Sequence, residues 1–222
     1  MDEYLSEKEQ IALIRQWWRE NGWFLIGGAL IAALGYLGFN QYQAYKQRVA
    51  EEASALYQEL RQHVADDDRG LADEVLSRLA ADYPTSGYLD QARFLIAQDN
   101  LVRDTQRAIS ELQAVVDQSN DDGMAKIARL RLARVLAYNE QYERALDILN
   151  VADLGGFEAR FSEVRGDIHA AMGNIDAAIS AYTNALLGAG NLSVNSDLLQ
   201  LKLNELIQAS LPDASDDDED GA

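Results

Sequence analysis

The sequence predicts an all-α protein in which one N-terminal transmembrane helix precedes an α-solenoid, a domain of stacked helical repeats. Three observations support this fold class. The chain of 222 residues has only 2 prolines and no cysteine, and it is rich in strong helix formers, which argues against a sandwich of short strands. An uninterrupted apolar run occupies residues 23–39. Beyond it, a pattern of small and large apolar residues recurs along the chain.

The charge of the chain narrows the kinds of partner that it can bind. The net charge is −18 at pH 7, and the pI is about 4.3. Such an acidic surface repels phosphate backbones and anionic lipid headgroups, so we expect no nucleic-acid partner. The lack of cysteine excludes disulfides and thiolate metal sites, and it fits a reducing cytoplasm and a bacterial periplasm equally.

The apolar run has the length and the flanks of a membrane crossing. A helix over residues 23–39 would be about 26 Å long, and the neighbouring residues complete a span at 23–42. Tryptophans precede the run and tyrosines follow it, as is typical of the two interfaces of a bilayer. A buried core helix would carry a polar stripe, which is absent here. A cleavable signal peptide would have a shorter apolar region and a small-residue cleavage site, which residues 40–45 lack.

The span also carries residues that could contact another membrane protein. Gly28 and Ala32 form a small-xxx-small pair, which lets a second helix approach closely. Trp17 and Trp18 lie just before the span. These four residues are our candidates for contact with a membrane partner, although small residues are common in transmembrane helices in general.

The charges beside the span indicate its orientation. Lys8, Arg15 and Arg19 precede it, and Lys46 and Arg48 follow it, which slightly favours a cytoplasmic N-terminus. The long domain would then lie in the periplasm of a bacterium. We therefore expect a cytoplasmic segment at 1–22, a transmembrane helix at 23–42, a periplasmic repeat domain at 43–209 and a disordered acidic tail at 210–222.

The soluble part contains repeats of the tetratricopeptide type, in which two antiparallel helices pair over about 34 residues. The second helix of such a pair has a small residue early, a large one four residues later and a small or apolar one three residues after that. Ala178, Tyr182 and Ala185 fit this pattern, and Ala145 and Leu149 fit it 33 residues earlier. Two weaker matches lie upstream, and their small, large and apolar positions are Ala108, Leu112, Val115, Ala72, Leu76 and Leu79.

Helices are also expected at both ends of the repeats. The segment 41–63 has Val49, Ala53, Leu56 and Leu60 at helical spacing, and it would pack on the first repeat as a cap. Residues 197–208 would form a closing helix that packs through Leu198, Leu201 and Leu206. A loop rich in glycine, asparagine and serine would precede that helix.

We find no motif that indicates catalysis, a cofactor or a metal. His63 and His169 lie far apart in the sequence, and a structural role is expected for both. The run 66–68 consists of three aspartates, but it lacks the spaced ligands and the glycine of a calcium loop. There is no phosphate-binding loop, HExxH or GxSxG motif. We therefore expect a protein that is not an enzyme and that needs no cofactor.

The architecture predicts that the repeat domain works by binding other proteins. Stacked helix pairs form a concave groove, which we expect to be mostly acidic and amphipathic and to hold an extended or helical segment. By repeat position, exposed groove candidates on the first helices are Arg129, Arg134, Glu163 and Arg165. Each of them could also belong to an ordinary solvated face.

Four stretches of the sequence are distinctive: residues 17–22 (WWRENG), 130–135, 155–167 and 201–206. Together they resemble the ancillary subunits of the bacterial SecYEG translocon, and the resemblance covers nearly the whole chain to about residue 206. It implies an inner-membrane protein that links the translocon to periplasmic chaperones, including a membrane-anchored prolyl isomerase, and that contacts secretory client chains. The alternative is an adaptor for cell-envelope assembly or stress regulation that uses the same repeats for another partner.

Overall fold

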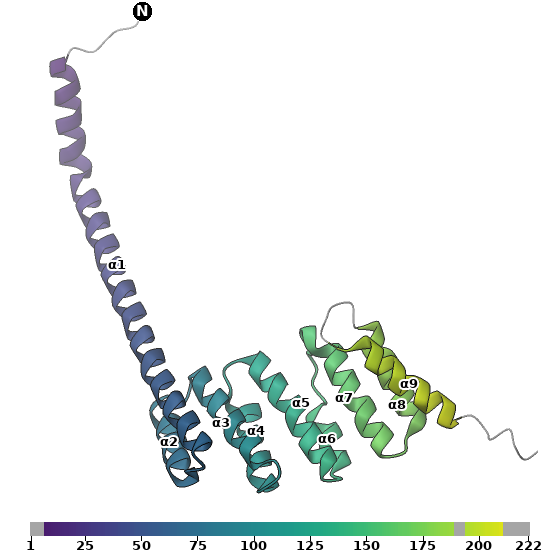
Figure 1. The fold of residues 1–222 in the computed structure, drawn as a ribbon. Coiled ribbons are helices and arrows are strands. Elements are labelled where there is room, and N and C mark those ends of the chain that lie inside the picture. The colour runs from purple at the N-terminus through teal and green to yellow at the C-terminus, as the bar shows by residue number, and fades with distance from the viewer. Residues whose placement is uncertain (1–6, 189–193, 211–222) are drawn as a thin grey trace, which may run out of the picture. The chain divides into compact units, whose positions relative to one another are not determined.

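The computed structural model describes residues 7–188 and 194–210, and within these ranges the regular structure is entirely helical. Residues up to Glu52 and residues from Ala53 onward form two compact units. The elements, labelled in Figure 1, are α1 (Glu7–Ala65), α2 (Arg69–Asp82), α3 (Gly87–Asn100), α4 (Thr105–Gln118), α5 (Asp122–Tyr138), α6 (Tyr142–Ile148), the short 3₁₀ helix η1 (Gly155–Phe157), α7 (Glu158–Ala171), α8 (Ile175–Leu187) and α9 (Ser196–Ser210). The all-α fold class is confirmed.

The first unit consists of the N-terminal part of α1. Among the described residues, this is the one helix long and apolar enough to cross a membrane, with a mean hydropathy of 1.7 over its most apolar window. Only 6% of that window is buried. Trp23, for example, is 81% exposed. This exposure is not that of a core helix, which was one alternative reading of the apolar run.

The second unit is built from successive helix pairs, as Figure 1 shows for α3 with α4, α5 with α6, and α7 with α8. The small, large and apolar positions predicted on the second helix of each pair are all buried. Ala72, Ala108, Ala145 and Ala178 are the small residues of α2, α4, α6 and α8, and each is at most 1% exposed. The predicted repeat pattern is therefore confirmed in these three pairs and in α2, which pairs with the end of α1.

Three of the four turns between paired helices, those before α2, α6 and α8, have the same backbone geometry, which the sequence does not reveal. Asp67, Glu140 and Gly173 each have positive φ, and each lies five residues before the small residue of its repeat. In each turn the next amide donates to a carbonyl five residues back: Asp68 to His63, Gln141 to Leu136 and Asn174 to His169. This is the hydrogen bond that closes a helix which ends in a left-handed residue.

That correspondence changes the role of the segment that ends α1. Residues 53–65 are joined to α2 by the same kind of turn that joins α5 to α6. They therefore form the first helix of the first repeat rather than an additional cap. Ala53, Leu56 and Leu60 are buried there, as predicted, against apolar residues of α2 and α3, whereas Val49 is only partly buried and is not part of this cluster. The cluster that they join also contains Val75, Leu76, Leu79, Leu89, Ala92 and Ile96.

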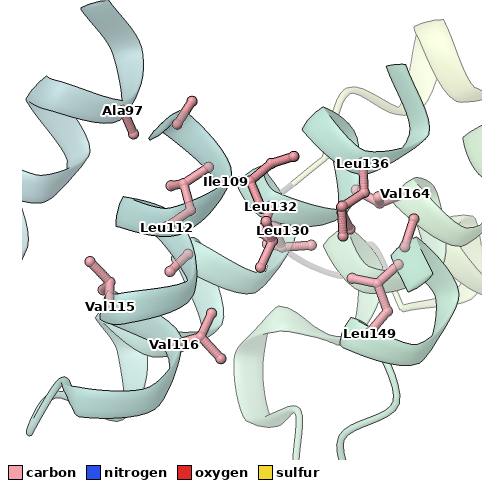
Figure 2. Packing of buried hydrophobic residues seen from close by; sticks show 14 of the residues in the cluster. Ala97, Ile109, Leu112, Val115, Val116, Leu130, Leu132, Leu136, Leu149 and Val164 are labelled. Carbon is pink, nitrogen blue, oxygen red and sulfur yellow. The ribbon is translucent and has the colours of Figure 1, made fainter. Parts of the chain in front are cut away.

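The core from Ala53 onward consists of three hydrophobic clusters. The first joins the end of α1 with α2 and α3, and the central and largest one runs from α3 to α7. In Figure 2, Leu112 and Val115 of α4 lie on one side of α5, and Leu149 and Val164 lie on the other. The last cluster is small and holds Ala159, Tyr182, Ala185, Val194 and Leu199.

The closing helix forms, but the register of its buried face differs from the prediction. Leu199 is 1% exposed and Leu206 packs against the last cluster, whereas Leu201 is 56% exposed and Leu198 is also exposed. The expected inward positions Leu198 and Leu201 are therefore wrong. Part of the preceding loop, and the acidic tail from residue 211 onward, lie outside the described residues.

Candidate functional site

Of the four groove candidates, only Arg134 on α5 is exposed. Glu163 on α7 is 8% exposed, and its carboxylate accepts a hydrogen bond from Arg160 at 3.3 Å. The expectation that Glu163 lies on an exposed surface is wrong, because this position of α7 turns toward neighbouring helices rather than solvent.

Arg129 and Arg165 are half-buried and bind the end of α6. Arg129 Nη1 donates to the carbonyl of Ile148 at 3.3 Å, and Arg165 Nη2 donates to the carbonyl of Leu149 at 2.6 Å. The last carbonyls of a helix have no partner within the helix, and cations are favoured beside them. Both arginines are therefore only partly exposed, whereas full exposure was expected, and their hydrogen bonds cap the end of α6.

A groove does lie between the first helices α3 and α5. It consists of two adjoining hollows of about 410 Å³ and 360 Å³, each in the size range of ligand clefts. Leu101, Arg134 and Val135 line both hollows. The remaining lining residues are Phe94, Ala97, Gln98, Val102, Thr105, Leu112, Arg131 and Tyr138.

The lining of this groove is apolar and basic. None of its lining residues is an aspartate or a glutamate. The guanidinium of Arg131 lies over the ring of Phe94 at 4.4 Å from the centroid, a cation–π contact. The prediction of a mostly acidic groove is therefore wrong for this site, although the whole chain is strongly acidic.

Most of these lining residues were missed by sequence reasoning. On α5, Arg131, Arg134, Val135 and Tyr138 follow a spacing of three and four residues, which places them on one face of the helix. The same helix buries Ala128, Leu132 and Leu136 on an adjacent face. The signal in the sequence was a second stripe of large side chains, both apolar and basic, on a helix whose core face is already assigned. Tyr138 is 86% exposed and Val102 is 94% exposed.

A neighbouring hollow near α2, α3 and α4 is occupied by charges that pair with one another. Arg69 and Arg103 both bind Asp67 and Asp99, and Arg107 binds Asp73 at 2.9 Å. The hydrogen bonds that Arg69 donates to Asp99 and Asp67 raise the pKa of its guanidinium above the ordinary value. Since these charges satisfy one another, this hollow is a structural ion-pair network.

Three charged side chains are buried between α3 and α4, namely Asp90, Arg93 and Glu111. Buried charged groups with shifted pKa values are also typical of catalytic sites. Burial raises the pKa of the Glu111 carboxyl, and the nearby guanidinium groups of Arg107 and Arg93 oppose that shift. Burial also raises the pKa of the Asp90 carboxyl, against the hydrogen bond from Ser119 at 2.6 Å. None of the three lines the grooves described above.

The two histidines occupy equivalent positions of the first and last repeats, at the end of each first helix. His63 lies 4.0 Å from Glu59, and neither Nδ1 atom has a hydrogen-bond partner among the described residues. Over residues 7–188 and 194–210, no cluster of histidine, cysteine, aspartate and glutamate could hold a metal ion. The aspartates at 66–68 lie in the turn before α2.

The candidate membrane contacts all lie on α1. Trp17 and Trp18 are about half exposed, and Gly28 and Ala32 are exposed and one helical turn apart. A Cβ atom at Gly28 would meet nothing within 4 Å, so the space beside this glycine is open. By contrast, Gly22 packs against the ring of Trp18, which a Cβ atom would approach to 3.2 Å.

The chain is similar to known proteins along nearly its whole length. A family model described as a tetratricopeptide repeat-like domain matches residues 15–208. A protein of Neisseria gonorrhoeae named ancillary SecYEG translocon subunit is 31% identical over 93% of this chain and 100% of its own length. The chain belongs to this family of ancillary SecYEG translocon subunits.

Other relatives with the same name come from further bacteria. The ancillary SecYEG translocon subunit of Aggregatibacter actinomycetemcomitans is 29% identical over 91% of this chain and 98% of its own length. That of Escherichia coli is 24% identical over 93% of this chain and 99% of its own length. No solved structure matches the chain. The similarity includes both the apolar helix and the repeats, as the resemblance had implied.

Proposed function

We propose that the protein is a membrane-anchored ancillary subunit of a bacterial SecYEG translocon and acts by binding other proteins. The observation that carries this proposal is the extent of the similarity. Relatives that bear this name match the apolar part of α1 and the helical repeats together, over 91–93% of the chain. A repeat fold with an open apolar groove supports a binding role rather than catalysis.

The proposed topology follows from the charges beside the span. Residues 1–22 lie in the cytoplasm, residues 23–42 cross the inner membrane, and the repeat domain at 43–209 lies in the periplasm. The three cations before the span, Lys8, Arg15 and Arg19, support this orientation against Lys46 and Arg48 on the other side.

In this proposal the two units bind different partners. The α1 face with Trp17, Trp18, Gly28 and Ala32 contacts the translocon within and beside the membrane, where small residues permit close helix packing. The repeat domain binds periplasmic chaperones, including a membrane-anchored prolyl isomerase, and secretory client chains. The exposed apolar lining of the α3–α5 groove is the surface suited to such segments.

Site-specific photo-crosslinking in living cells tests both halves of the proposal. A crosslinker at Ala32 should trap a translocon component, whereas one at Leu30, about 200° around the helix from Gly28, should trap much less. A crosslinker at Val102 should trap a chaperone or a secretory chain, and one at the exposed Arg144 on α6 serves as its control.

Two results would contradict the proposal. If no position among Trp17, Trp18, Gly28 and Ala32 traps a translocon component, association through α1 is wrong. If the repeat domain traps only envelope-assembly or signalling proteins, the alternative of a cell-envelope or stress-regulatory adaptor is correct.

A further inference from the structure

Arg131 and Arg134 stand apart from the other arginines of the repeat domain. The other arginines from residue 53 onward each have a hydrogen bond or an ion pair; they are Arg61, Arg69, Arg78, Arg93, Arg103, Arg107, Arg129, Arg144, Arg160 and Arg165. Within the described part of that domain, Arg131 and Arg134 have neither. In a chain with 37 acidic and 19 basic residues, two arginines with neither a hydrogen bond nor an ion pair are unexpected.

Both of these arginines line the same groove. Arg131 and Arg134 are exposed residues of α5, and both line the larger hollow beside Phe94 and Leu101. The apolar neighbours hold water away once a ligand covers them, and this strengthens a charged hydrogen bond to a guanidinium. A ligand without negative charge would bury one or both guanidinium groups without a partner, which is costly.

We infer that the groove between α3 and α5 binds a segment of a partner protein that presents apolar side chains together with carboxylates. Leu101, Val102, Val135 and Tyr138 provide contacts for the apolar side chains. Arg131 and Arg134 provide planar guanidinium groups that can each bind a carboxylate through two hydrogen bonds. This inference rests on the proposed binding role of the repeat domain, and it adds the chemistry of the segment that is bound.

An array of short immobilised peptides, probed with the purified full chain in detergent micelles, tests this specificity. Each leucine- and phenylalanine-containing scaffold appears with aspartate and glutamate, with asparagine and glutamine, or with lysine at the same polar positions. The natural chain should retain the acidic versions best and the lysine versions least. The double variant Arg131→Gln with Arg134→Gln should bind the strongest peptide at least about tenfold more weakly than the natural chain does.

Charge reversal sharpens the test. In the variant Arg131→Glu with Arg134→Glu, the order of preference should invert, so that lysine versions bind best. The matched control carries Arg61→Glu and Arg144→Glu, two exposed arginines outside the groove that hydrogen-bond only to glutamines three residues earlier. The control should keep the natural order. Far-UV circular dichroism of each variant verifies that the helices are intact.

Three outcomes would overturn the inference. In the first, reversing the charges at Arg131 and Arg134 leaves the order of preference among the peptides unchanged. In the second, the order changes equally in the control variant. Peptides could also bind only after removal of residues 211–222, which would assign the groove to the acidic end of this chain instead. Since the array contains no translocon, its failure would leave the crosslinks from α1 unaffected and is thus distinguishable from failure of the proposed function.

Discussion

At the scale of single residues, the contact between α7 and α8 depends on a glycine and a ring. Gly166 lies in the middle of α7, and a Cβ atom there would approach Tyr182 Cε1 to 2.5 Å. The Tyr182 hydroxyl donates to Asp167 at 2.8 Å, and Lys202 of α9 binds the same carboxylate oxygen at 2.6 Å. These bonds hold the ring in place, so it cannot move aside easily.

The substitution Gly166→Ala should therefore destabilise the domain by about 1–3 kcal/mol, because it overpacks a fixed contact. Chemical denaturation followed by circular dichroism measures this change. Gly70→Ala is the control, since a Cβ atom at that helical position meets nothing within 4 Å. The cost of Gly166→Ala should largely disappear in a chain that already carries Tyr182→Leu, and equal costs in both backgrounds would contradict the explanation.

Asp90 provides a prediction about pH. Its raised pKa means that the folded chain holds the carboxyl proton more tightly than the unfolded chain does. This tighter binding of the proton stabilises the folded chain. The stabilisation is fully present below the ordinary pKa of 3.8, and it is lost as the pH rises through the pKa of the folded state. Asp90→Asn keeps an acceptor for the Ser119 hydroxyl but does not titrate. In urea titrations, the stability of this variant relative to the natural chain should increase as the pH rises above 3.8. A difference that stays constant or falls would contradict this assignment.

At the scale of helices, α6 is the shortest α-helix of the described residues, and it is supported from both sides. Arg129 comes from α5 before it and Arg165 comes from α7 after it, and both bind its last carbonyls. A helix of this length is not stable by itself, so its position depends on packing and on these two bonds. This arrangement links three helices of neighbouring repeats.

Arg165→Ala should lower the free energy of unfolding by about 1.5 kcal/mol or more, since it removes a charged hydrogen bond to a partly buried carbonyl. Arg134→Ala, on the exposed groove, should change it by less than about 0.5 kcal/mol. Thermal or urea denaturation of both variants gives the comparison. Equal effects would mean that Arg165 does not support α6.

The same helices explain what the sequence could and could not predict. The small residue at the start of each second helix is set by close packing within its own repeat, so periodicity alone found Ala72, Ala108, Ala145 and Ala178. The role of Arg165 depends on where the end of another helix lies, which spacing along the chain does not contain. The register of α9 was missed because leucines lie on both of its faces.

At the scale of the whole molecule, the hydrophobic clusters of the repeat domain draw all their buried residues from Ala53 onward. A chain that begins at Gln43 should therefore be soluble without detergent and should show a cooperative thermal transition. Size-exclusion chromatography and circular dichroism test this expectation. If the shortened chain aggregated or lacked a transition, the compact unit that begins at Ala53 would need the preceding segment to fold.

The division of the core into three clusters also determines how the domain opens. In repeat proteins each element is stabilised by its neighbours alone, so terminal elements can detach while the centre stays folded. The last cluster holds five buried residues and relies on the bond between Lys202 and Asp167 to keep α9 in place. Amide hydrogens of α8 and α9 should therefore exchange with solvent well before those of α4 and α5. A pulling force on the C-terminal end would detach α9 first and leave the α3–α5 groove intact.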